Sequence, residues 1–372
     1  MTSPYYQHPD HPDGAVEVST NYEQEAQCWL SRISTCVKST EHYNVSKRAY
    51  PRIPQTSQER RDASLTECTF DAKALSTSDL TAAAEKGKTV LYLAYGSNLC
   101  NETFRGKRGI KPLSQVNVLV PSLRLTFDLP GVPYIEPCFG NTAMREPDAA
   151  DYHKNRWHKG LVGCVYEVTL SDYAHIIATE GGGAGYQDIL VDCYPLEDGD
   201  TVPETPKTKQ FVAHTLFAPV DKSHARPDPS YAQPSARYLN LITTGAVELA
   251  LPQEYQDYLN DIRTYTITTK RQEMGKALFG ALWWPFLQLL FALSAQFQDD
   301  KGRSPAWLAK LSMLIFAGMW GCYDGAFKKV FGDGERTEGD EVLGREIREE
   351  EWRRIGEENG WLRSAERGED LV

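Results

Sequence analysis

The sequence predicts an α+β domain followed by a pair of apolar helices, and three observations lead to this assignment. An apolar, β-branched and aromatic run at 89–94 stops at a turn-forming sequence, which is typical of a buried strand. The segments 171–196 and 233–258 carry helical periodicity that glycine or proline interrupts. The stretch 277–295 contains no charged residue. We therefore expect a leader at 1–86, the α+β domain at 87–268, an apolar helical hairpin at 269–331 and a charged tail at 332–372.

The first 86 residues differ in composition from the domain that follows. They are rich in Ser, Thr, Pro, Gln and charged residues without sustained periodicity, which predicts a flexible leader. The chain begins MTSPYYQHPDHPDG, which lacks the basic start and apolar core of a signal peptide. The α+β domain is therefore expected to face the cytosol.

The predicted strand at 89–94 leads directly into Tyr95, Gly96, Ser97, Asn98 and Leu99. Glycine permits a close approach between backbone and ligand, and short polar side chains stand beside N–H groups that can point at an anion. A carboxylate suits such a turn. An ordinary exit from strand to loop is the alternative, and this motif alone does not decide between the two.

The segment 171–196 is predicted to form a short helix, a glycine-rich break and a strand. Ser171 is the expected N-cap, Ile176 and Ile177 form an apolar face, and the glycines at 181–183 end the helix. Glu180 then lies at the helix end, beside exposed backbone. A solvated surface glutamate is the alternative. The glycines lack the Gly-Lys-Ser/Thr of a phosphate-binding loop.

The segment 233–258 is predicted to form two helices. The first begins near Pro234 and breaks before Leu251-Pro252, and the second is short. On its own, Tyr238 is expected to be a packing residue whose hydroxyl has a partner. Apolar residues at helical spacing are expected in the core, namely Leu239, Ile242, Val247 and Leu249.

Taken together, these motifs resemble the γ-glutamylcyclotransferase family over 88–265. The resemblance rests on order and spacing: YGSNL at 95–99, Glu180-Gly181 before a strand, PSARY at 234–238, Gly245-Ala246, and LPQEY at 251–255. The stretches 108–131 and 178–196 are similar to the fungal branch associated with gliotoxin-type epidithiodioxopiperazine clusters. The resemblance implies a small mixed β-barrel with flanking helices.

The resemblance implies a reaction that needs no metal, nucleotide or other cofactor. The α-amine of a γ-glutamyl group attacks its own γ-carbonyl, closes the 5-oxoproline ring and expels the amine that was attached there. Because attacker and electrophile share one molecule, the protein mainly has to fold the substrate and move protons. The implied substrate is a small γ-glutamyl compound, either a glutathione adduct in mycotoxin biosynthesis or a compound of glutathione metabolism.

The resemblance also assigns the site residues. Glu180 matches the catalytic glutamate, whose role requires a raised pKa. The loop 95–99 matches the substrate loop, whose N–H groups would hold the glutamyl end or its developing oxyanion. Tyr238 matches a tyrosine that lines the pocket, and Tyr186 is a further substrate-binding candidate. The glycine insert at 181–185 departs from the family pattern and puts the loop geometry at Tyr186 in doubt.

Beyond Tyr265 the chain is unlike the soluble members of that family. At about 1.5 Å per residue, the uncharged stretch 277–295 nearly spans a hydrocarbon core of about 30 Å. A second apolar stretch, 305–323, is interrupted by Lys310, which can snorkel toward an interface. These stretches predict a membrane-associated hairpin. The alternative is a soluble cytoplasmic protein whose helical extension packs on the domain.

Basic residues flank the predicted hairpin at 270–276 and at 328–329, whereas its connecting loop has only Lys301 and Arg303. This bias favours both ends of the hairpin on the cytosolic side. The tail at 332–372 is dense in Glu and Arg, which predicts a solvated helix and a frayed end.

Composition argues against several other classes of protein. The net charge of −11, without a basic stripe, argues against a nucleic-acid partner. The eight cysteines contain no CxxC pair, so the sequence suggests neither a metal site nor a dithiol centre. A catalytically silent protein that binds a γ-glutamyl-like ligand, or scaffolds partners at a membrane, is the alternative function. The carboxylate at Glu180 favours the enzyme, and a γ-glutamylamine substrate is a third hypothesis.

Overall fold

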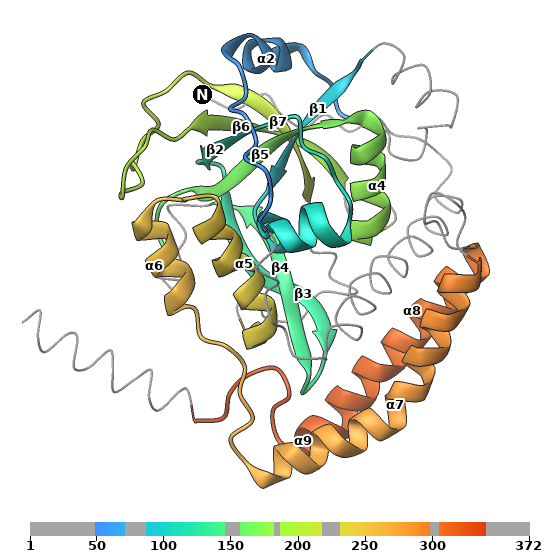
Figure 1. The fold of residues 1–372 in the computed structure, drawn as a ribbon. Coiled ribbons are helices and arrows are strands. Elements are labelled where there is room, and N and C mark those ends of the chain that lie inside the picture. Colours follow the sequence, from blue (N-terminus) through green and yellow to red (C-terminus); the bar gives the residue numbers. More distant parts are fainter. Residues whose placement is uncertain are drawn as a thin grey trace, which may run out of the picture.

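A computed structural model describes residues 49–70, 87–145, 157–181, 187–217, 231–297 and 305–339. At its centre is a closed β-barrel with the strand order β1-β5-β2-β6-β7 (Figure 1). The barrel is mixed, because β7 runs parallel to β1 while the other neighbours are antiparallel. The expected α+β fold with a small mixed barrel is confirmed. The strands are β1 (Thr89–Ala94), β2 (Ser114–Val120), β5 (Leu161–Thr169), β6 (Gln187–Pro195) and β7 (Phe211–Phe217).

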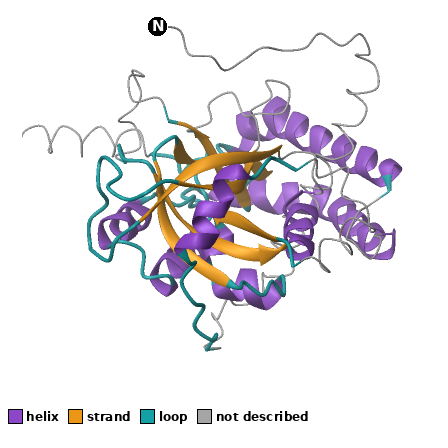
Figure 2. Ribbon diagram, turned by 90° about the horizontal axis from the view of Figure 1, so that it is seen from above, coloured by secondary structure: helices purple, strands orange, loops and turns teal. Residues whose placement is uncertain are grey.

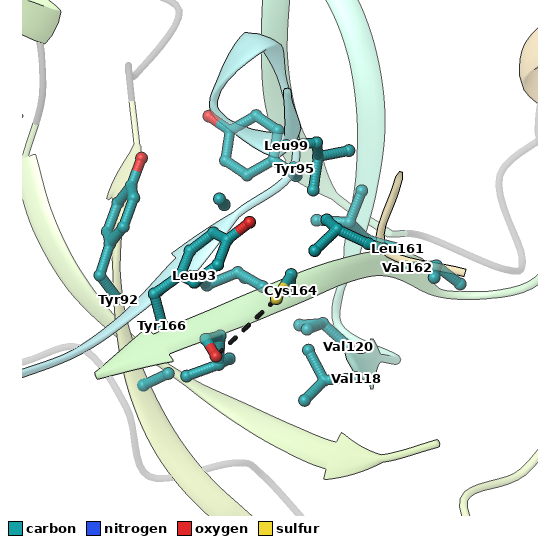
Figure 3. Packing of buried hydrophobic residues seen from close by; sticks show 14 of the residues in the cluster. Tyr92, Leu93, Tyr95, Leu99, Val118, Val120, Leu161, Val162, Cys164 and Tyr166 are labelled. Atoms are coloured by element: carbon teal, nitrogen blue, oxygen red, sulfur yellow. Dashed lines mark hydrogen bonds between the residues drawn. The ribbon is translucent and has the colours of Figure 1, made fainter. Parts of the chain in front are cut away.

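The barrel strands are covered on both faces, which explains why β1 is an almost continuous apolar run rather than an alternating one. Figure 3 shows Leu93, Val118 and Leu161 of three neighbouring strands in the core. Other residues of these strands stack on rings outside the barrel, where Tyr166 lies 4.6 Å from Phe104, centroid to centroid. The core is therefore continuous from the barrel to its covering elements.

Helices surround the barrel, as the view from above in Figure 2 shows. They are α4 (Leu170–Gly181), α5 (Ala236–Glu248) and α6 (Gln253–Asp261), with two short turns, η2 (Ser97–Leu99) and η3 (Glu102–Lys107), after β1. The first predicted cap is wrong: Thr169 Oγ1, not Ser171, accepts the Asp172 N–H at the start of α4. The helix starts earlier because the last residue of β5 is itself a good cap.

Residues before the expected domain boundary at residue 87 already pack against the barrel. Residues 49–70 belong to the predicted leader, yet they contain helix α2 (Gln58–Ala63) and the turn η1 (Ser64–Thr66). Gln55 pairs with Gln115 at the edge of β2, and Ser64 Oγ accepts the backbone N–H of Val212 on β7 at 2.9 Å. The rest of the predicted leader lies outside the described residues.

A two-stranded hairpin, β3 (Leu123–Val132) and β4 (Glu136–Met144), stands apart from the barrel. Among the described strands, β3 and β4 pair only with each other. The hairpin projects from the barrel toward the C-terminal helices (Figure 1). Its position is therefore set by side-chain packing and by contacts at its tip.

The C-terminal helices form the predicted hairpin. They are α7 (Lys270–Phe297) and α8 (Ala306–Cys322), followed by the turn η4 (Tyr323–Phe327) and α9 (Lys328–Phe331). The helices α7 and α8 lie side by side (Figure 1), with Leu290, Leu308 and Ile315 buried between them. Of the described helices, α7 alone is long and apolar enough to cross a membrane.

The segment after α9 returns to the rest of the fold. The carbonyl of Gly334 accepts the Tyr134 N–H at 2.8 Å, and the carbonyl of Glu335 accepts the Gln233 N–H at 2.9 Å. Glu335 is buried. The first residues of the expected solvated tail, 332–339, are thus packed, and the remainder of the tail lies outside the described residues.

Candidate functional site

The loop after β1 is held in place by its own side chains. Tyr95 donates its hydroxyl hydrogen bond to a carbonyl oxygen of β7 at 3.1 Å, and Asn98 Nδ2 donates to the Tyr92 hydroxyl at 2.9 Å. Leu99 is fully buried in the main core (Figure 3). Three of the five predicted loop residues therefore fix the loop, and residues 96–97 are its partly exposed part.

The exposed part of the loop is a single tight turn. The Leu99 N–H donates to the Gly96 carbonyl at 3.0 Å, and the Cys100 N–H donates to the Ser97 carbonyl at 3.3 Å. In such a turn the first N–H groups lie outside the internal hydrogen bonds and point out of the N-terminal end. Backbone N–H groups need this geometry to bind an anionic group.

Helix α5 lies directly against the loop. A methyl group at Gly245 would stand only 2.4 Å from the carbonyl carbon of Leu99, so the glycine is what permits this close approach. One turn further on, Glu248 accepts the Asn101 N–H at 2.8 Å. The predicted Gly245-Ala246 motif therefore sets the distance between α5 and the loop.

Tyr238 lies in the first turn of α5 and reaches toward the same loop. Its N–H donates to the Ser235 side chain, which caps the helix one residue after the predicted start near Pro234. Its hydroxyl accepts the Gly140 N–H of β4 at 3.0 Å, and its ring meets Phe139 edge to face at 5.2 Å. A methyl group at Gly96 would lie 3.5 Å from that hydroxyl. The loop, α5 and β4 thus converge at Tyr238.

Sequence reasoning did not identify the contribution of β4. Phe139 and Gly140 contact a tyrosine that is 98 residues away in the chain, as the span of the Gly140–Tyr238 bond shows. Neither a motif nor a periodicity in 136–144 marks this contact. The contact became visible only in the structure, where β4 is buried along most of its length although it lies outside the barrel.

Glu180 lies in the last turn of α4, one residue before the helix ends at Gly181. The predicted apolar face is present, since Ile176 and Ile177 are both buried. The side chain of Glu180 and the whole of Tyr186 lie outside the described residues. Their predicted roles, and the predicted raised pKa of Glu180, therefore stay predictions.

A buried polar cluster joins both flanks of the Glu180 segment. Tyr173 of α4 donates its hydroxyl hydrogen bond to Asp188 of β6 at 2.7 Å, and His214 Nδ1 of β7 lies 3.0 Å from both oxygens of that carboxylate. From the N-terminal segment, Phe70 donates its N–H to Asp188 at 2.7 Å and stacks on the imidazole. Glu67 Oε2 is 3.3 Å from His214 Nε2.

The charges in this cluster favour a protonated histidine. Burial of the imidazole lowers the pKa of His214, but the hydrogen bonds and charges of Asp188 and Glu67 outweigh burial and raise that pKa overall. Burial beside Asp188 raises the pKa of Tyr173 well above its ordinary value, so its hydroxyl stays a donor. We name this set (Glu67, Phe70, Tyr173, Asp188 and His214) the His214 cluster.

The described residues offer no metal centre. They contain no group of three or more His, Cys, Asp or Glu side chains that could hold an ion. The cysteines in the described part of the chain are free thiols, and Cys100 beside the loop is buried. Burial raises the pKa of Cys100, consistent with a small packed side chain.

Comparison with known proteins places these features in context. The family model described as AclK C-terminal domain matches residues 269–330. The protein named gamma-glutamyl cyclotransferase gliK of Aspergillus fumigatus is 34% identical over 267 residues, which cover 69% of this chain and 94% of that protein. Gamma-glutamyl cyclotransferase aclK of Aspergillus oryzae is 30% identical over 260 residues, which cover 68% of this chain and 92% of that protein.

A solved structure named Gamma-glutamyl cyclotransferase superposes on the chain with a TM-score of 0.36 and 20% sequence identity. The superposition covers 49% of this chain and 93% of that one. Each of these two alignments leaves close to a third of this chain uncovered.

Proposed function

Since the chain belongs to the gamma-glutamyl cyclotransferase family of enzymes, we propose that it releases 5-oxoproline from a γ-glutamyl compound. The observation that carries this proposal is the convergence of Gly96, Gly140 and Tyr238 at one point. A turn with outward N–H groups and a tyrosine hydroxyl there suits a carboxylate or a developing oxyanion.

In the proposed reaction, the α-amine nitrogen forms a bond to the γ-carbonyl carbon, and the bond from that carbon to the leaving amine then breaks. Glu180 takes the proton that the attacking nitrogen loses and returns it to the departing amine, so no proton is gained or lost overall. Such acid and base catalysis contributes about 10² to 10⁴-fold. The end of α4 suits this role, because the negative end of a helix disfavours a charged carboxylate and so favours a raised pKa.

The remaining parts of the proposal divide the work of binding. The N–H groups of the loop 95–99 stabilise the oxyanion, and Tyr238 donates from its hydroxyl to the substrate or orients Glu180. Tyr186 is proposed as a further substrate-binding residue. Because attacker and carbonyl share one molecule, holding them in attack geometry supplies much of the rate.

We further propose that the substrate is a glutathione adduct of a secondary metabolite. Removal of the γ-glutamyl group from such an adduct leaves a cysteinyl-glycine conjugate, whose next amide bond becomes open to a peptidase. The support is the similarity to the gliK and aclK proteins over most of their length. Free γ-glutamyl dipeptides and γ-glutamylamines are the competing substrates.

The test uses the full chain, with 5-oxoproline measured by mass spectrometry. The substrates are glutathione, a γ-glutamyl dipeptide and a bulky S-conjugate of glutathione. We expect the conjugate to be turned over best, and Glu180→Gln to lose at least about 10²-fold in kcat. The matched control, Glu197→Gln, changes an exposed carboxylate and should retain wild-type rates. No product from any substrate would favour the silent ligand-binding protein, and better turnover of the dipeptide would reject the adduct.

We also propose that the C-terminal hairpin, through 277–295 and 305–323, associates with a membrane while the barrel faces the cytosol. The support is an exposed apolar face on α7, where six large side chains are 45–53% exposed: Met274, Leu278, Leu282, Phe286, Leu289 and Phe297. Five of them recur at spacings of three or four residues, so they share one side of the helix. No charged residue lies between 277 and 297 to interrupt this face.

Flotation of the full chain with phosphatidylcholine and phosphatidylserine vesicles tests the hairpin proposal. We expect the wild-type protein to float and Leu282→Glu to float severalfold less, because a charge on the apolar face opposes burial in lipid. Val247→Glu is the matched control, since Val247 is also an exposed apolar residue, at 63%, but lies on α5. A wild-type protein that stays with the unbound fraction would favour the soluble cytoplasmic alternative.

A further inference from the structure

The β3–β4 hairpin touches both the candidate site and the C-terminal helices. Its base packs in the main core, where Leu123, Leu125 and Phe139 are buried. Its tip packs in a separate cluster, where Val132 and Tyr134 meet residues of α7, α8 and η4. Figure 1 shows the hairpin spanning the space between the barrel and these helices. If the tip of the hairpin moves, β4 can therefore transmit that movement to the candidate site.

Tyr134 anchors the tip through its backbone, hydroxyl and ring. Its N–H donates to the Gly334 carbonyl at 2.8 Å, and its hydroxyl donates to the Gly332 carbonyl at 2.8 Å. Its buried ring meets Phe279 and Tyr323 edge to face, at centroid distances of 5.9 and 5.6 Å. The residue has φ +64°, a left-handed conformation that is uncommon for a bulky side chain. The surrounding contacts thus hold Tyr134 in a backbone conformation that a tyrosine does not favour on its own.

Two residues further along, Glu136 fixes β4 to the start of α5. Its Oε2 accepts hydrogen bonds from Arg237 Nε at 3.0 Å and from Arg237 Nη2 at 2.6 Å. The carboxylate is 1% exposed, so the pair is shielded from solvent. Arg237 is the neighbour of Tyr238, and the pair therefore sets the register of β4 against the helix that carries this tyrosine.

At Gly140, β4 meets the Tyr238 hydroxyl directly. The N–H of Gly140 donates to that oxygen at 3.0 Å, and a methyl group at Gly140 would stand 3.1 Å from it. There is thus little room between strand and hydroxyl, and a small shift of β4 moves the hydroxyl or breaks the bond. The contacts run along one strand from Tyr134 through Glu136 to Gly140.

We propose that Tyr134 is a positioning residue for Tyr238, because it anchors β4 in the C-terminal helices and so holds Gly140 against the Tyr238 hydroxyl. The residues of the C-terminal helices that pack against Tyr134, together with the segment 332–334, are then part of the unit that carries out catalysis. This inference rests on the proposed role of Tyr238 in binding substrate. It gives the hairpin 269–331 a task in the reaction, whatever surface its outer face meets.

The test is a double-mutant cycle between Tyr134→Asn and Tyr238→Phe in the full chain. Asparagine tolerates the left-handed backbone and removes both the ring and the hydroxyl. We expect Tyr134→Asn to lower kcat/KM for 5-oxoproline release about tenfold in the wild-type background. In the Tyr238→Phe background, where the hydroxyl is already absent, the further loss should stay below about twofold.

Two more variants separate positioning from general stability. Leu308→Ala opens a cavity between α7 and α8 in a cluster that does not include Tyr134, and it should leave kcat/KM unchanged although the melting temperature falls. If Tyr134→Asn does not fold, Tyr134→Phe removes only the bond to Gly332, with an expected loss of about threefold that also vanishes in the Tyr238→Phe background.

The possible outcomes separate the positioning role of Tyr134 from the proposed role of Tyr238 in binding substrate. An equal loss of kcat/KM in both backgrounds, wild-type kinetics for Tyr134→Asn, or a similar loss for Leu308→Ala would overturn the positioning role alone. Wild-type kinetics for Tyr238→Phe would overturn both the role of Tyr238 and the inference. Non-additive losses with an unaffected Leu308→Ala would support it.

Discussion

A single methyl group at Gly245 should push the loop 95–99 away from α5. An alanine Cβ there would lie 2.4 Å from the Leu99 carbonyl carbon and 2.5 Å from the Cys100 nitrogen. These are backbone atoms, which no rotamer change can move. Relief therefore requires the helix and the loop to separate by about 1 Å, since ordinary contacts between carbon atoms begin near 3.5 Å.

The magnitude for Gly245→Ala follows from two opposing effects. Overpacking in a rigid contact costs about 3 kcal/mol at the upper end of its range, whereas alanine in a helix gains about 1 kcal/mol over glycine. We expect a net loss of about 2 kcal/mol, or about 4–8 °C in melting temperature. A shift of about 1 Å at a binding loop can lower kcat/KM by about 10²-fold.

Calorimetry and steady-state 5-oxoproline assays on the full chain measure both effects. The matched control is Gly280→Ala in α7, where a methyl group would meet nothing within 4 Å. That variant should gain up to about 1 kcal/mol and keep wild-type kinetics. Wild-type stability and kinetics for Gly245→Ala would refute the close approach of α5 to the loop.

Two further predictions concern titratable groups. The pKa of His214 is raised, so its contribution to stability is fully present below the unfolded pKa, near 6.5, and is lost as the pH rises through the folded value. The melting temperature of wild type should therefore exceed that of His214→Gln by more at pH 6 than at pH 8.5. A difference in melting temperature that does not change with pH would contradict the charged cluster. Burial raises the pKa of the Cys100 thiol, so iodoacetamide at pH 7.5 should modify the exposed Cys68 and spare Cys100 in peptide maps, and equal labelling would show that Cys100 is accessible.

The helices and the first strand were predictable because their signals are local. Ser235 caps α5, α4 ends at Gly181, and Pro252 directly precedes α6. Errors arose where tertiary contacts decide the outcome. Val247 has helical spacing with core residues, yet it is 63% exposed because α5 turns that side away from the barrel. The strand order of the barrel is also nonlocal, since β5 lies between β1 and β2. The sequence predicted no strand order, and the barrel itself was expected only from the family resemblance.

The site was predictable only where one segment carries it. A strand that ends in a turn-forming sequence predicts the loop 95–99. In the structure, most of its side chains hold the loop in place rather than face outward. Gly140 and the His214 cluster gave no sequence signal, because each contact joins strands or helices that are far apart in the chain. Asp188 and Tyr173 look like ordinary polar residues until folding brings them together.

The His214 cluster bears on the position of Glu180, the proposed base, which precedes a run of glycines. Glu180 ends a helix and is followed by glycines, whose backbone freedom opposes a fixed side-chain position. Tyr173 lies seven residues before Glu180 and Asp188 eight residues after it, and the 2.7 Å bond between them closes the segment at both ends. A loop whose ends are tied loses much of its freedom, at an entropic cost that grows only slowly with length. On the proposed roles of Glu180 and Tyr238, Tyr173→Phe should reduce kcat more than it raises KM for the conjugate, because the proposed substrate contact at Tyr238 remains while the segment that carries the proposed base loses the Tyr173–Asp188 bond. An unchanged kcat, with the melting temperature lowered, would restrict the cluster to stability.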